Sequence, residues 1–93
     1  MAWSFDAGFL ERGESTTWAF WWARNEYAGI QVVQAKPRPS VGGGIGIVSD
    51  VTLRVTSQAL RMDLSRGYTY YVTVTNLDGL IYRYDIVGTR VDE

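Results

Sequence analysis

Apolar and polar residues alternate along most of this chain, and this alternation constrains the fold more than any other feature of the sequence. Trp18, Phe20 and Trp22 fall on one face of their segment, and Leu53 and Val55 share a face further along. Alternation with a period of two residues is typical of half-buried β-strands. No apolar pattern with the 3.6-residue period of a helix runs long enough to predict one, so we expect an all-β chain.

The alternation predicts about seven short antiparallel strands, as in a β-sandwich or a barrel. Pro37 and Pro39 end the third of these runs, and a turn is expected at residues 57–59. The expected inward faces are Trp3, Phe5, Ala7 and Phe9; Trp18, Phe20 and Trp22; Ile30 and Val32; Ile45, Ile47, Val51, Leu53 and Val55; Leu60, Met62 and Leu64; Tyr68, Tyr70, Val72, Val74 and Asn76; and Leu80, Tyr82, Tyr84 and Ile86.

The last two runs predict a β-hairpin around Asp78-Gly79, and two turns compete for it. A two-residue Asp-Gly turn mixes the two faces, whereas a three-residue loop with Gly79 in the left-handed region keeps the apolar residues together. We therefore expect the second register. It sets Val72 opposite Tyr84 on the inner face, and it sets Tyr71 opposite Asp85 and Thr73 opposite Arg83 on the outer face.

The segment from Leu64 to Val74 carries a Leu, a Gly three residues later and a Tyr six residues later, with alternating valines behind it. This segment resembles the E-to-F corner of immunoglobulin-like and fibronectin type III-like domains, including many bacterial modules. The resemblance implies an immunoglobulin-like β-sandwich in which the Tyr70 hydroxyl bonds backbone near Leu64. The sequence departs from these families in lacking the antibody Cys pair and in placing Arg66 before Gly67, where Pro is common.

The composition argues against several classes of chemistry. The chain has no Cys and no His, so it lacks thiolate ligands, disulfides, the commonest general base and the commonest metal ligand. The acidic residues are scattered singly, and the glycine run 42–46 lacks the spacing and the Lys of a phosphate-binding loop. We therefore expect no enzyme, no catalytic residues, no metal and no cofactor. A net charge of −1 argues against a nucleic-acid partner.

Aromatic residues are abundant, with four Trp, six Tyr and three Phe in 93 residues. If the neighbours of Trp21 in the Trp-rich strand fill the core, Trp21 points outward, and Tyr71 does so on its own strand. These rings either cover the sheet surface or form a patch for a partner, since Trp, Tyr and Arg are favoured at interface hot spots. The candidate binding residues are Trp21, Tyr71, Arg83 and Asp85, together with Arg24, Asn25 and Tyr27 in the turn after the Trp-rich strand.

Three partners suit such a patch: a protein surface, including a second copy of the chain; a glycan; and a membrane interface. A single Lys and a net negative charge disfavour the membrane. We expect one domain over residues 1–93 that acts as a non-catalytic binding or assembly module through protein contact or self-association, with a small carbohydrate-binding module as the alternative. No signal peptide or apolar span is visible, so a cytoplasmic location is the default expectation.

Overall fold

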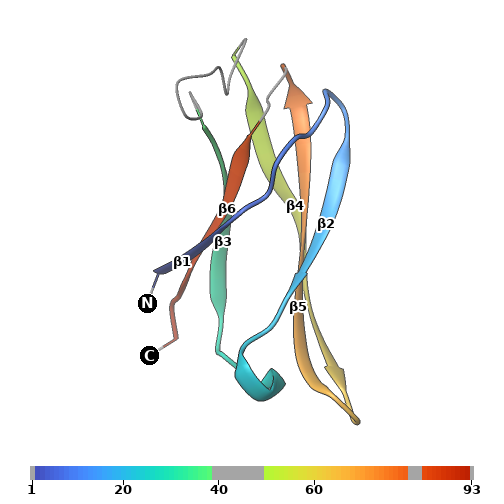
Figure 1. The fold of residues 1–93 in the computed structure, drawn as a ribbon, viewed down its shortest axis with the longest axis vertical. Helices are drawn as coiled ribbons and strands as arrows, with labels where there is room; N and C mark the ends of the chain where they lie inside the picture. The colour runs from blue at the N-terminus through green and yellow to red at the C-terminus, as the bar shows by residue number, and fades with distance from the viewer. Residues whose placement is uncertain (1, 39–49, 80–82, 93) are drawn as a thin grey trace.

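A computed structural model describes residues 2–38, 50–79 and 83–92 of the chain (Figure 1). The strands within them are β1 (Ala2–Asp6), β2 (Ser15–Phe20), β3 (Gln31–Pro37), β4 (Thr52–Asp63), β5 (Gly67–Asp78) and β6 (Tyr84–Arg90). The 3-10 turn η1 (Ala23–Asn25) follows β2. The predicted apolar run at residues 45–47 and the glycine run lie outside the described residues.

The strands form two antiparallel three-stranded sheets, one in the order β1-β6-β3 and the other in the order β2-β5-β4. Figure 1 shows the two sheets side by side along the long axis of the molecule. The predicted all-β, antiparallel architecture is therefore confirmed. Each sheet has one apolar face, and packing those faces together removes them from water.

The hydrophobic core lies between the central strands of the two sheets. Val72 and Val74 of β5 face Tyr84 and Ile86 of β6, and all four are almost completely buried. Partly buried side chains surround this centre: Trp3, Phe5, Ala7, Trp18, Phe20, Ala35, Val51, Leu53 and Val55. The Tyr84 hydroxyl accepts a hydrogen bond of 3.0 Å from the Trp18 indole nitrogen. This bond satisfies the polar atoms of two aromatic side chains that pack in or against the core.

The inward face predicted for β5 is confirmed, including Asn76, whose side chain has no exposed surface. The Asn76 amide nitrogen donates to the carbonyl oxygens of Leu10 and Gly79, and its backbone bonds Gly13 and Glu14. Asn76 therefore fastens the β1–β2 connection over one end of the core. Gly79 has a φ of 83°, so its predicted left-handed conformation is also confirmed.

The predicted pairing of β5 with β6 is wrong, because these strands lie in different sheets. β5 pairs with β2 and β4, and β6 pairs with β1 and β3. Val72 and Tyr84 meet across the core instead of along a hairpin, and Tyr71 lies opposite Ala19 and Ala59 rather than Asp85. The inward faces of β5 and of Tyr84 and Ile86 on β6 were correct, but alternation along a strand does not say which strand lies beside it.

The turn predicted at residues 57–59 is also wrong, since β4 runs through it to Asp63. A bulge between Val55 and Ser57 shifts the register against β5 and changes which residues face inward. Leu60 and Met62 consequently lie on the inner face, opposite Tyr70 and Tyr68, as the sequence predicts. They are nevertheless 46% and 53% exposed, because the tip of the β4–β5 hairpin extends past the start of β3 (Figure 1).

Leu64, expected to point inward, is 94% exposed in the hairpin turn. The inward face predicted for the third run is reversed as well: Ile30 and Val32 are exposed, whereas Gln31 and Val33 are buried. Gln31 is held inside by two hydrogen bonds, one from the Trp3 indole and one to the Ala28 carbonyl oxygen.

β1 ends at Asp6, whereas the alternation predicted by the sequence continues to Phe9. Phe9 and Leu10 lie beyond the strand, and their inward and outward positions are the reverse of those predicted. Gly8 adopts a φ of 88°, a left-handed conformation that interrupts the extended backbone. Beyond it Leu10 is 1% exposed and Phe9 is 50% exposed, the opposite of the alternation expected from the sequence.

Candidate functional site

The start of β3 and the second half of β4 both contribute residues to one cavity. This cavity has a volume of about 210 Å³, and we call it the β3–β4 cleft. Its lining is largely apolar and comes from β2, the 27–33 segment, β4 and β5: Phe20, Tyr27, Gly29, Ile30, Gln31, Val33, Gln58, Ala59, Leu60, Tyr70 and Tyr71. The cleft is therefore an apolar opening into the side of the sandwich.

Exposed apolar side chains gather at and beside this cleft. Tyr27 and Ile30 are 46% and 57% exposed, and Leu60 and Met62 on β4 are similarly exposed. Tyr27 packs against Tyr68 with 5.4 Å between ring centroids, so the Tyr68 ring lies under a neighbouring aromatic. Such a concentration of large apolar side chains is characteristic of an interaction surface.

Both strands that flank the cleft lie at sheet edges. Within the described residues β3 pairs with β6 alone and β4 with β5 alone. Alternate backbone N–H and C=O groups on the outer side of such strands have no partner in the sheet. An extended segment of another chain can use these groups, and Pro37 restricts this only at the far end of β3.

Hydrogen bonds fix the 28–30 segment, which forms one lip of the cleft. The Tyr70 hydroxyl donates to the Gly29 carbonyl oxygen at 2.7 Å and accepts from the Ala28 N–H at 3.0 Å. Burial raises the pKa of Tyr70, so its hydroxyl keeps its proton at neutral pH. This hydroxyl bonds the 28–30 segment and not the backbone near Leu64, so the bond predicted there is wrong.

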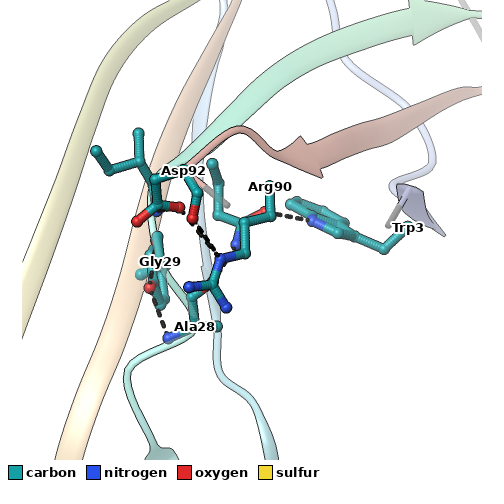
Figure 2. Close-up of polar contacts among 8 residues, drawn as sticks. Trp3, Ala28, Gly29, Arg90 and Asp92 are labelled. Carbon is teal, nitrogen blue, oxygen red and sulfur yellow. Dashed lines mark hydrogen bonds and ion pairs between the residues drawn. The ribbon is translucent and has the colours of Figure 1, made fainter.

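Asp92 holds the same lip from the other side (Figure 2). Its carboxylate accepts a 2.7 Å bond from the Ile30 N–H and lies 3.1 Å from Nε of Arg90. The bond from Ile30 lowers the pKa of Asp92 most, and Arg90 adds to the effect. Gly29 has a φ of 86°, and a Cβ there would meet the Arg90 and Asp92 side chains at 2.3 to 2.7 Å, so this turn requires glycine.

A second cavity, of about 270 Å³, lies on the other side of the same segment. Its lining combines aromatic rings with charged and amide groups: Trp3, Trp22, Glu26, Tyr27, Ala28, Gln31 and Arg90. Trp3 and Trp22 meet edge to face with 5.8 Å between centroids. The Gln31 amide is already hydrogen-bonded to Trp3 and Ala28. The charged residues that line this cavity are Glu26 and Arg90.

The structure divides the predicted site residues between three places. Trp21 is 61% exposed, so its outward orientation is confirmed. Tyr71 follows the buried Tyr70 on β5 and is among the residues that line the β3–β4 cleft. Arg83 and Asp85 belong to the other sheet, so the prediction that they lie opposite Thr73 and Tyr71 is wrong.

Arg83 and Asp85 are both engaged in ion pairs within the protein. Asp85 accepts two bonds from Arg38, at 2.9 and 2.6 Å, and these bonds lower the pKa of Asp85. Arg83 pairs with Asp6 of β1. Both pairs connect neighbouring segments of the β1-β6-β3 sheet and therefore have a structural role.

Of the three predicted turn residues, Tyr27 lines both cavities, whereas Arg24 and Asn25 lie in η1 just before it. Arg24 and Asn25 adopt positive φ values of 62° and 50° in η1, and the Asn25 amide donates to the Tyr68 carbonyl oxygen. The sequence reasoning missed Ile30 because it placed that residue in the core. The exposure of Leu60 and Met62 was missed because the sequence does not predict how far the β4–β5 hairpin extends beyond β3.

Residues 2–38, 50–79 and 83–92 contain no group of three acidic side chains arranged to hold a metal ion. No helix in the described part of the chain is long and apolar enough to cross a membrane.

Comparison with family models, with curated proteins and with solved structures finds no match to this chain.

Proposed function

We propose that this chain is a non-catalytic protein-contact module that binds an extended apolar segment at the β3–β4 cleft. The observation that carries the proposal is the apolar cavity lying beside unpaired strand edges. At about 210 Å³ the cleft is smaller than the roughly 300–1,000 Å³ of pockets for drug-sized ligands. It is suited to a single large apolar side chain.

An edge strand beside a pocket is the arrangement used in strand addition. Backbone hydrogen bonds to the edge supply affinity, and a side chain in the pocket supplies specificity. The lip of the cleft is pre-ordered by the bonds of Tyr70 and Asp92 to residues 28–30, so little ordering cost falls on binding. The exposed rings and aliphatic chains around the cleft add apolar contact area.

Selection from a phage-displayed library of random 12-residue peptides tests this function. We expect enriched peptides to share a large apolar residue, and their binding to fall at least tenfold in Leu60→Glu, which places a charge on the cleft wall. Leu77→Glu is the matched control, because Leu77 is 42% exposed on β5 at the opposite end of the β4–β5 hairpin. Equal losses in the two variants, or no enriched peptide, would refute the proposal.

Glycan binding is the second candidate function, and the second cavity favours it. Trp3, Trp22 and Tyr27 offer faces for the apolar side of a sugar ring, while Glu26 and Arg90 can bond its hydroxyls. Titration with soluble polysaccharides should then change tryptophan fluorescence, and Glu26→Ala should abolish the change. An unchanged spectrum over a broad glycan panel would exclude this function.

For the fold, we infer an immunoglobulin-like sandwich whose first strand takes the place of the last. Immunoglobulin domains carry strands A, B, E and D in one sheet and C, F and G in the other. The order β2-β5-β4 matches B-E-D, and β3-β6 matches C-F. β1 then lies antiparallel to β6, where strand G would lie. An experimental structure with a different strand order would refute this inference.

A further inference from the structure

The second half of β4 is an unusually exposed strand. After the bulge, residues 58–62 are all exposed, and β5 is their only partner strand among the described residues. Leu60 and Met62 lie on its inner face, and Arg61 lies on its outer face. A long edge with exposed apolar side chains is a template for pairing with another strand.

The charges on this edge are self-complementary. Arg61 and Asp63 lie two residues apart, so their side chains share the outer face of β4. The Asp63 carboxylate is fixed by the N–H and the hydroxyl of Ser65, at 2.9 and 2.7 Å. The Ser65 hydroxyl is the main cause of the lowered pKa of Asp63, which is therefore ionised at neutral pH.

Antiparallel pairing of this strand with a second copy has few possible registers. Centred on Met62, the pairing sets each Arg61 opposite the Asp63 of the other copy. Centred on Arg61 or on Asp63, it sets like charges opposite each other, which is destabilising. Centred on Leu60, it leaves Arg61 opposite Ala59. Only the register about Met62 forms two ion pairs.

We propose that two copies of this chain form a symmetric dimer in which their β4 edges pair antiparallel about Met62. Because residues 64–66 form the hairpin turn, the paired stretch is Arg61, Met62 and Asp63 of each copy, and through it the two three-stranded sheets join into one six-stranded sheet. Met62 faces Met62 of the second copy on the inner face, and the same surface is used on both copies, as a two-fold axis requires. This proposal rests on the proposed function, because it makes a second copy a partner of the open side of the sandwich.

Disulfide trapping tests the register directly, because the chain contains no Cys. Residues directly opposite each other in an antiparallel pair have Cβ atoms about 4.5–5.5 Å apart, close enough for a disulfide after a small adjustment. Met62→Cys should therefore give a covalent dimer in a glutathione redox buffer at low micromolar protein. Leu60→Cys is the control, since its two copies lie about 13 Å apart along the strands in this register.

The trapping experiment overturns the proposal if Leu60→Cys cross-links as readily as Met62→Cys or if neither does. Circular dichroism shows whether both variants are folded. Sedimentation equilibrium of Arg61→Asp supplies an independent measurement, because this change sets an Asp against each Asp63. We expect the dimer dissociation constant to rise at least tenfold.

Arg54→Asp is the matched charge control. Arg54 is exposed on the same face of β4, before the bulge, so its reversal should change the dissociation constant less than twofold. Equal weakening by the two reversals would overturn the proposed register. A monomeric chain that still binds selected peptides would refute the dimer and leave the proposed function standing, whereas a chain that does neither would refute both.

Discussion

Gly88→Ala should destabilise the protein strongly, because the Trp3 ring lies directly over Gly88. A Cβ at position 88 would come within 2.2, 2.6 and 2.8 Å of three atoms of the Trp3 indole. Real side chains do not approach so closely, so the ring or the backbone must move. The residues pair directly, Trp3 on β1 with Gly88 on β6, so the displacement pushes β1 away from its only partner strand among the described residues.

The expected loss follows from two contributions. Forcing an extra methyl group into a packed site costs about 1–3 kcal/mol. Moving the indole also breaks its 2.9 Å bond to Gln31, a buried side chain, and an unsatisfied buried acceptor costs about 1–3 kcal/mol. Together the free energy of unfolding should fall by about 2–6 kcal/mol, out of a total of about 5–15 kcal/mol. The melting temperature should fall by at least about 8 °C.

Urea denaturation followed by tryptophan fluorescence measures this loss, and a double-mutant cycle assigns its cause. In a Trp3→Leu background the added methyl group has more room, so Gly88→Ala should cost at least about 1 kcal/mol less there. A Gly88→Ala variant within about 0.5 kcal/mol of the parent would refute the argument. Strict additivity of the two changes would show that the loss has a different origin.

Three further predictions concern the core, an ion pair and the lip of the cleft. Trp18→Ala should cost about 3–5 kcal/mol in urea denaturation and Trp21→Ala much less, and equal losses would contradict the inward and outward faces assigned here. Because the hydrogen bond from Arg38 lowers the folded pKa of Asp85, the pair contributes stability above the unfolded pKa of about 3.9 and loses it as the pH falls through the folded value. Asp85→Asn should therefore flatten the decline in the free energy of unfolding below about pH 4, and an unchanged slope would contradict the assigned role of the pair. Tyr70→Phe should cost about 1–3 kcal/mol and speed amide hydrogen exchange in residues 28–30, whereas unchanged exchange there would show that the hydroxyl does not hold the lip.

Local alternation predicted the inward and outward faces of β2 and β5, because the phase of a single strand depends only on its own residues. Trp21 and Asn76 are the clearest cases, one exposed and one completely buried. The partner of each strand depends on contacts far along the chain. For this reason Gly79 has the predicted conformation while β5 and β6 lie in different sheets.

The candidate site was harder to predict because its residues break the local pattern. Gln31 is buried although it is polar, since Trp3 and Ala28 satisfy its amide, and Ile30 is left outside as a result. Leu60 and Met62 lie on the predicted face but extend beyond the strand that would cover them. Neither the position of Trp3 nor the length of the β4–β5 hairpin relative to β3 can be read from the neighbouring sequence.

The strand order has a consequence for how the chain folds. Among the described strands, only β4 and β5 are neighbours both along the chain and within a sheet. The pairing of Ala2 with Thr89 closes a loop of almost the whole chain, which is entropically costly. We expect folding on a millisecond-to-second scale that starts at the β4–β5 hairpin. During synthesis, β1 and β3 have to wait for β6 to leave the ribosome before their sheet can form.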